Sequence, residues 1–200
     1  MDLKTRLLRC CLMTVVAASV SARTCLVCSG DERNVVVSDN ELAELTSQAE
    51  LKRLDLNDSK VTDAGLVHLK DLEKLRFLSL NRTQVGDAGM IHLKGLSQIK
   101  SLSLNETKIT DAGMKHLAGI TQLRTLCLDK TKITDKGIAQ LKDLTKLEWL
   151  YLNDTHITDE GLKHLKGMTQ LRFLSVVHTK ITDAGVDDLH ETLPTVRIRR

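Results

Sequence analysis

Cysteine side chains in this sequence stand at a spacing that raises the question of redox or metal chemistry. Cys25 and Cys28 form a Cys-x-x-Cys pair, which in an exported chain predicts a small structural disulfide. A redox-active pair and half of a zinc site are the alternatives, but the first needs a βαβ context and the second needs further ligands. Cys127 has no predicted disulfide partner.

Four histidines share one place in a repeating pattern and would line up along successive helices. Helix axes ~8–10 Å apart leave successive imidazoles too far from any one ion for Zn–N bonds of ~2.0–2.1 Å. We therefore predict surface histidines rather than a metal site or a pH sensor, and we predict no cofactor. The four are His68, His92, His116 and His164.

An aspartate also returns at a fixed interval, which at first suggests calcium. Threonine precedes it in five of the six copies, and this pair suits a helix N-terminus, where carboxylate oxygens accept from free N–H groups. Calcium would instead need several oxygen ligands around one centre. We predict helix caps at Asp63, Asp87, Asp111, Asp135, Asp159 and Asp183.

Catalysis and nucleic-acid binding find little support. No Ser/His/Asp or Cys/His set converges, and no glycine-rich phosphate loop is present, so we predict a protein that is not an enzyme. Without residues 1–22, which hold three of the 29 Lys and Arg and one of the 26 Asp and Glu, 26 basic residues face 25 acidic ones. Such a balance does not favour nucleic acid as a partner.

The histidines, the aspartates and Cys127 sit in six copies of one 24-residue pattern between Leu51 and Pro194, L-x-x-L-x-L-N-x-T-x-I-T-D-x-G-L-x-H-L-x-x-L-x-x. Positions 1, 4, 6, 11, 16, 19 and 22 are apolar in every copy except at Thr192. Positions 3 to 7 alternate as in a strand with one buried face, and the later positions fit a turn and a helix. A fixed period of this length predicts a solenoid in which each repeat buries its apolar face against its neighbours.

The pattern resembles the leucine-rich repeat family, whose L-x-x-L-x-L-x-x-(N/C)-x-L consensus all six copies match except at position 9, with Val176 in place of one leucine. The I-T-D-x-G-L segment is most similar to the subclass found in bacterial repeat proteins and in F-box-type proteins. The resemblance implies a right-handed, curved α/β solenoid with a parallel sheet on the concave face and helices on the convex face. Position 9 carries Ser or Thr instead of the family's Asn or Cys, and we predict that this hydroxyl bonds the backbone of the following turn.

The two ends differ from the repeats. Basic residues, a short uncharged run and Val20-Ser21-Ala22 predict a cleaved secretory signal that is too short to span a membrane. Ser38 and Glu41 have the spacing of a capping box in a half-repeat. We expect a signal peptide over 1–22, an N-terminal cap over 23–50, the six repeats over 51–194 and a capping strand or tail over 195–200.

Large rings are confined to positions 3 and 5 of the repeat, which should point out of the sheet into solvent. Rings concentrated on an exposed strip are typical of a contact surface, although they could also serve only to pack on one another across the strands. Position 2 is mostly basic and predicts a positive rim, with a solvated fringe balanced by nearby acids as the alternative. The predicted partner-binding residues are Phe77, Trp149, Tyr151, Phe173, Arg53 and Arg124.

We therefore expect an exported, monomeric binding module that recognises a protein or peptide through its concave sheet and adjoining loops. Its location would be secreted, periplasmic or at the cell surface, and cytoplasmic if 1–22 is not a signal. The alternatives are an intracellular F-box-type adaptor for ubiquitin ligation, although 23–50 shows no recognisable F-box, and a structural repeat in a surface assembly. Glycosylation in a eukaryotic host stays open at Asn57, Asn81, Asn105 and Asn153.

Overall fold

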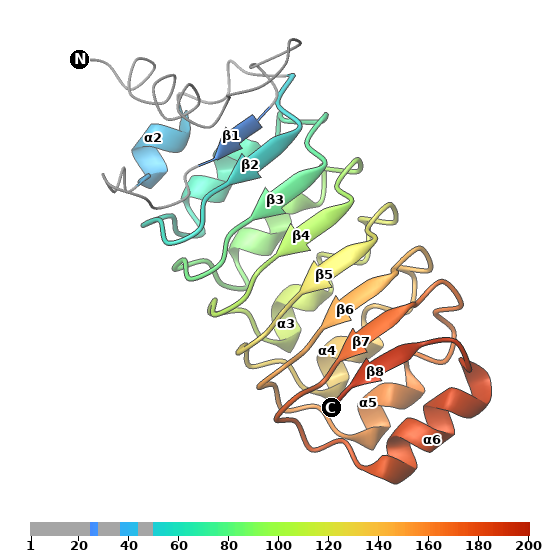
Figure 1. The fold of residues 1–200 in the computed structure, drawn as a ribbon. Coiled ribbons are helices and arrows are strands. Elements are labelled where there is room, and N and C mark those ends of the chain that lie inside the picture. Colours follow the sequence, from blue (N-terminus) through green and yellow to red (C-terminus); the bar gives the residue numbers. More distant parts are fainter. Residues whose placement is uncertain (1–24, 28–36, 44–49) are drawn as a thin grey trace, which may run out of the picture.

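A parallel sheet runs the length of the molecule. The computed structural model describes residues 25–27, 37–43 and 50–200. Neighbouring strands pair in register one repeat apart, for example Leu54 with Leu78, and their order in the sheet is their order in the chain (Figure 1). The eight strands of the described residues are β1 (Cys25–Val27), β2 (Arg53–Asp55), β3 (Phe77–Ser79), β4 (Ser101–Ser103), β5 (Thr125–Cys127), β6 (Trp149–Tyr151), β7 (Phe173–Ser175) and β8 (Arg197–Arg199).

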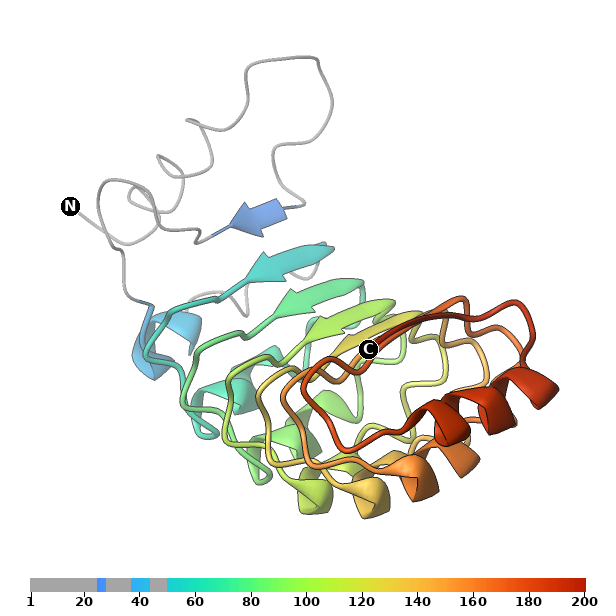
Figure 2. The same ribbon diagram turned by 60° about the horizontal axis from the view of Figure 1, so that its bottom comes forward.

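Short helices form the opposite layer (Figure 2). Most are a single turn, because each repeat leaves only a few residues between the turn after its strand and the return to the next strand. They are α2 (Asp39–Ala43), the 3-10 helices η2 (Gly65–Leu69) and η3 (Gly89–Leu93), α3 (Asp111–Met114), α4 (Asp135–Ala139), α5 (Asp159–Lys163) and the longer α6 (Asp183–Thr192). None of the helices in the described residues is both long and apolar enough to cross a bilayer.

The core lies between the sheet and the helices and is aliphatic. The seven apolar positions of the repeat are buried in every copy, except that Val186 is only partly buried and Thr192 is exposed. Leu102, in the middle of the stack, has no exposed surface. The predicted core is therefore confirmed for the described repeats, and none of the chain's aromatic residues belongs to it.

The hydroxyl at position 9 bonds the backbone as predicted in five of the six copies. Thr83 Oγ1 donates to the carbonyl of Leu80 at 2.7 Å, and the same bond recurs in each later repeat at 2.6 Å. Ser59 is the exception, because its buried Oγ has no hydrogen-bond partner among the described residues. The first repeat therefore lacks a stabilising bond that its successors have.

The repeating aspartate behaves differently from the predicted helix cap. The threonine before it caps the helix: Thr110 Oγ1 accepts from the N–H of Ala112. The aspartate instead reaches the next repeat, where Asp87 accepts from Thr110 N at 2.8 Å and from Thr110 Oγ1 at 2.6 Å. The prediction was right that this position lies at a helix N-terminus and wrong about which groups the carboxylate binds. The same two bonds to the following repeat are made by Asp39, Asp111, Asp135 and Asp159. Asp63 makes only the backbone bond, to Gly86 N, because glycine replaces the threonine there.

The glycine at position 15 makes room for that carboxylate. A Cβ on Gly113 would lie 2.5 Å from Oδ1 of Asp87, and the corresponding distance is 2.1–2.6 Å in all six copies. The residue therefore stays small so that the aspartate of the preceding repeat can approach closely.

Local contacts also stabilise the two ends of the repeat array that the structure describes. In the N-terminal half-repeat, the N–H of Ser38 donates to Glu41 Oε2 at 2.7 Å, as in a capping box. At the other end Asp183 has no following repeat and pairs with Arg200, while β8 adds the last strand. The predicted signal peptide, Cys28 and most of the predicted N-terminal cap lie outside the described residues, and Cys25 is described only as the first backbone position of β1.

Candidate binding face

The sheet face is formed by positions 3 and 5 of each repeat, which point away from the core. Trp149 is 41% exposed and Phe77 is 37% exposed, while Tyr151 and Phe173 are half-buried. All four rings are thus on the solvent side of the sheet rather than between the sheet and the helices. This alternation follows from the strand geometry, because the leucine between each pair of face residues is buried.

Three of the rings form one cluster on β6 and β7, which we call the aromatic cluster: Trp149, Tyr151 and Phe173. Trp149 and Phe173 are direct cross-strand neighbours, with ring centroids 5.6 Å apart. Tyr151 lies diagonally, with its ring centroid 5.4 Å from that of Phe173. Partial burial, together with Cys127 and Asp129, raises the pKa of the Tyr151 phenol, so it is protonated at neutral pH. The cluster is a mostly apolar surface with one hydroxyl.

The fourth ring stands apart. Phe77 is on β3, and β4 and β5 separate it from the aromatic cluster. Its ring is covered by the guanidinium of Arg53, whose Cζ lies 4.7 Å from the ring centroid. At position 3 the two intervening strands carry the small residues Ser101 and Thr125. The structure therefore brings together three of the four predicted aromatic contacts and leaves Phe77 paired with Arg53.

Cys127 lies between these regions on β5. Burial raises the pKa of its thiol to about 11, although a hydrogen bond with Ser103 acts in the opposite direction. At neutral pH the group is the unreactive thiol rather than the thiolate nucleophile. Cys127 therefore serves as a small, half-buried residue of the sheet face.

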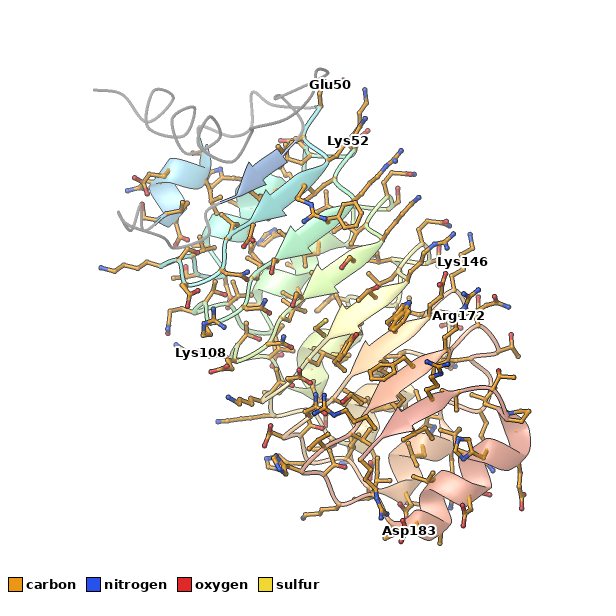
Figure 3. All side chains as sticks on the ribbon, in the orientation of Figure 1. Glu50, Lys52, Lys108, Lys146, Arg172 and Asp183 are labelled. Atoms are coloured by element: carbon orange, nitrogen blue, oxygen red, sulfur yellow. The ribbon has the colours of Figure 1, made fainter. Side chains whose placement is uncertain are left out.

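The predicted positive rim at position 2 is neutralised near the aromatic cluster. Glu148 pairs with Arg124 at 2.7 Å and with Arg172 at 3.8 Å. Glu148 is the less exposed partner, with 18% of its side chain accessible against 55% for Arg124. Arg172 lies where the strands begin (Figure 3). One carboxylate thus fixes two guanidinium groups beside the rings.

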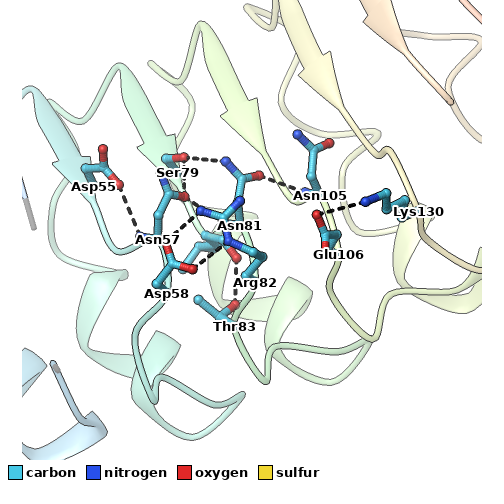
Figure 4. Close-up of polar contacts among 11 residues, drawn as sticks. Asp55, Asn57, Asp58, Ser79, Asn81, Arg82, Thr83, Asn105, Glu106 and Lys130 are labelled. Atoms are coloured by element: carbon cyan, nitrogen blue, oxygen red, sulfur yellow. Dashed lines mark hydrogen bonds and ion pairs between the residues drawn. The ribbon is translucent and has the colours of Figure 1, made fainter. Parts of the chain in front are cut away.

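The residue at position 8 forms the edge where the strands end, and we call this set the loop-edge row. In all six copies it has a positive φ between 54° and 59° although none is glycine. Charges alternate in sign along the row and pair across repeats, as in Asp58 with Arg82 at 2.5 Å (Figure 4). Arg82 holds the pKa of the Asp58 carboxyl below its usual value. The row consists of Asp58, Arg82, Glu106, Lys130, Asp154 and His178.

Sequence reasoning treated the loop-edge residues only as possible contacts and missed their pairing. Lys130 lies 3.4 Å from Glu106, and His178 Nδ1 lies 3.0 Å from Asp154. The signal was present in the sequence as the alternation of sign at this position over Asp58, Arg82, Glu106, Lys130 and Asp154. Exposed pairs of this kind contribute little stability, so they mainly balance charge along this edge.

The asparagine at position 7 is also part of the scaffold. Asn57 Oδ1 accepts from Asn81 N at 2.8 Å and from Ser79 Oγ at 2.7 Å (Figure 4). Asn153 bonds the next repeat in the same way, Asn105 makes only the bond to the backbone N–H, and Asp129 replaces asparagine without loss of that acceptor. These amides are half-buried and hold the turns together, so they present little free surface to a partner.

The repeated histidines lie on the helix side, away from the sheet face. His68, His92 and His116 are half-buried and His164 is exposed. Within the part of the chain that the structure describes, no group of three or more His, Cys, Asp or Glu side chains is arranged to hold a metal ion.

Comparison with known proteins fits this geometry. A family model described as a leucine-rich repeat region matches residues 33–197. The chain belongs to the leucine-rich repeat family, and its fold is an α/β leucine-rich repeat solenoid. A comparison with curated proteins finds no match.

Two solved bacterial structures share the fold. Internalin C2 of Listeria monocytogenes is similar with a TM-score of 0.58 and 24% identity, over 88% of this chain and 80% of that one. A leucine-rich repeat protein of Leptospira interrogans is similar with a TM-score of 0.58 and 20% identity, over 79% of this chain and 45% of that one. At these identities the likeness supports the fold alone.

Proposed function

We propose that this protein is an exported binding module that recognises a protein or peptide through the aromatic cluster and the surrounding sheet face. The observation that carries the proposal is the position of Trp149, Tyr151 and Phe173 on solvent-facing strand positions while the core uses only aliphatic residues. Aromatic side chains are enriched among the residues that dominate binding energy at protein interfaces. The leucine-rich repeat family is typically one of non-catalytic binding modules.

The size of the sheet face limits the kind of partner. The six strands of the repeats, β2 to β7, at ~4.8 Å spacing and with three residues of each, give a strip of about 300 Å², against the ~800 Å² per partner of an ordinary interface. The loop-edge row adjoins the strip and would extend it. A peptide, or a protein that also contacts the loop-edge row, fits this area better than a large flat partner.

Affinity capture tests the binding role. The mature chain from residue 23 is used as bait beside a Trp149→Ala/Tyr151→Ala/Phe173→Ala variant, with folding of both checked by circular dichroism. We expect the wild type to retain a partner that the triple variant loses, because interface hot spots cost at least ~2 kcal/mol on truncation. Equal retention by both baits would contradict a role for the aromatic cluster, and retention of no partner by either bait would favour a purely structural role.

Export is proposed from the basic and uncharged segments of residues 1–22. The test is the N-terminal sequence of the protein recovered from its native host. Export predicts a chain that begins at Arg23 in an extracellular, periplasmic or surface fraction. A chain that begins at Met1 in the cytoplasmic fraction would contradict it.

A further inference from the structure

Two arginines of the last strand extend the aromatic cluster. Arg197 pairs in register with Phe173, and Arg199 pairs with Ser175. Both arginines are exposed, while Ile198 between them is partly buried against the core. Strand alternation therefore puts both guanidinium groups on the sheet face beside the rings. We call this set the aromatic–arginine patch: Trp149, Tyr151, Phe173, Arg197 and Arg199.

Unlike some other arginines of the chain, these two have no acidic partner among the described residues. Arg82 pairs with Asp58, and Arg200 pairs with Asp183. Arg197 and Arg199 form no ion pair with any residue that the structure describes. Two like charges side by side on one face create a local positive potential that attracts an anionic group.

We propose that the partner's contacting segment is an acidic peptide that places an apolar side chain on the aromatic cluster and carboxylates on Arg197 and Arg199. The proposal rests on the proposed function and specifies its partner chemistry. A guanidinium presents paired N–H donors that match the two oxygens of a carboxylate, so the patch can select Asp or Glu by geometry as well as by charge.

Nucleic acid fits the same surface less well. The rings of Trp149 and Phe173 are tilted by 35° and pack on one another, so they are not spaced as separate platforms for successive bases. Glu148 pairs with Arg124 and Arg172, so these neighbouring guanidinium groups are less available to a phosphate backbone. The chain's formal net charge of +3 also supplies no extended basic track.

Peptide selection tests the proposal. A phage library of random peptides of about twelve residues, which can span the described sheet at ~3.3 Å per residue, is panned on three immobilised full-length baits and the bound peptides are sequenced. The baits are the wild type, an Arg197→Glu/Arg199→Glu variant, and a control in which Arg76→Gln/Lys108→Gln removes two exposed positive charges away from the patch. Folding of each bait is checked by circular dichroism.

We expect the wild type and the control to enrich peptides in which Asp and Glu together are at least about twofold more frequent than in the library. The charge-reversed bait should lose this bias or select Lys and Arg. For one selected peptide, Arg197→Gln/Arg199→Gln should weaken binding about two- to thirtyfold, as expected for two exposed ion pairs, and added salt should reduce the difference. Trp149 is the chain's single tryptophan, so its fluorescence reports binding at the patch directly.

The outcomes separate this proposal from the proposed function. Peptides that are enriched without an acidic bias, or whose binding is unchanged by the Arg197→Gln/Arg199→Gln variant, overturn the acidic-partner proposal and leave a binding role intact. A failure of every folded bait to enrich any peptide counts against peptide recognition altogether. If Trp149 fluorescence shows that oligothymidylate binds with higher affinity than the selected peptide, nucleic acid is the better ligand and the proposal is overturned.

Discussion

The helix-side edge, formed by positions 12, 13 and 15 of the repeat at the helix N-termini, differs from the sheet face in how much its residues vary from one repeat to the next. At the helix-side edge the same aspartate, threonine and glycine return in nearly every copy, because Asp87 must reach backbone and hydroxyl donors of the next repeat and Gly113 must leave space for it. On the sheet face, positions 3 and 5 carry side chains as different as Arg53, Ser101 and Trp149. Within this chain the invariant residues make contacts between repeats, whereas the variable positions 3 and 5 lie on the solvent side of the sheet.

The largest effect on stability should come from the core. Leu102→Ala removes a fully buried side chain between neighbouring repeats and should lower the free energy of unfolding by about 2–5 kcal/mol. Ser101→Ala, on the sheet-face side of the same strand, should change it by less than about 0.5 kcal/mol. Urea unfolding followed by circular dichroism measures both. Similar losses for the two variants would break the distinction between the core and the sheet face.

A matched pair of glycines tests the helix-side edge. Gly113→Ala places a methyl group 2.5 Å from Asp87 Oδ1 and 3.2 Å from Asp87 Cα, so we expect a loss of about 1–3 kcal/mol as the carboxylate is displaced. A Cβ on Gly167 would meet nothing within 4 Å, and Gly167→Ala should be neutral or slightly stabilising. Thermal and urea unfolding of the two variants compare them directly. A Gly113→Ala protein as stable as the wild type would show that this close approach can relax without cost.

The hydroxyl groups at position 9 of the repeat should have a smaller effect on stability, and one of them serves as a control. Thr107 Oγ1 donates to Leu104 O at 2.6 Å, and Thr107→Ala leaves that buried carbonyl without the bond, at a cost of about 1–2 kcal/mol. Ser59 lacks this bond, so Ser59→Ala should change stability by less than about 0.5 kcal/mol. Equal costs at both positions would mean that packing of the side chain, rather than its hydrogen bond, stabilises the turn.

The smallest effect is expected in the loop-edge row. The side chains of Arg82 and Asp58 are 50% and 54% exposed, and Arg82→Gln should cost no more than about 1 kcal/mol. The difference should vanish in about 1 M NaCl, where the Debye length falls to ~3 Å. Unfolding at low and high salt measures it. A larger loss that persists in salt would place this pair among the scaffold contacts rather than at the exposed edge.

Much of the fold could be predicted because the same pattern of buried and exposed positions occurs in six copies along the sequence. The buried positions, the strands around Leu54 and its equivalents, and the threonine hydroxyl bonds all follow from local rules of alternation and turn chemistry. The target of the aspartate could not be predicted in the same way. Spacing along one chain does not tell whether Asp87 binds its own helix or the stacked neighbour, and only the packing of repeats decides it.

The candidate site was less accessible to sequence reasoning. The rings at Trp149 and Phe173 could be placed as neighbours because their strands differ by one repeat. The double pairing of Glu148 could not be predicted, because a single acidic residue in a mostly basic row does not tell which neighbouring side chains it reaches. Side-chain reach, which the repeat pattern does not encode, settles these contacts.

The most direct test of the account measures stability and binding on the same Trp149→Ala protein. Loss of one partly exposed ring should cost about 0.5–1.5 kcal/mol of unfolding free energy but at least ~2 kcal/mol of binding to a captured partner or selected peptide. Binding within ~0.5 kcal/mol of the wild type would contradict the central claim that the variable sheet face, and the aromatic cluster in particular, is where this repeat protein recognises its partner.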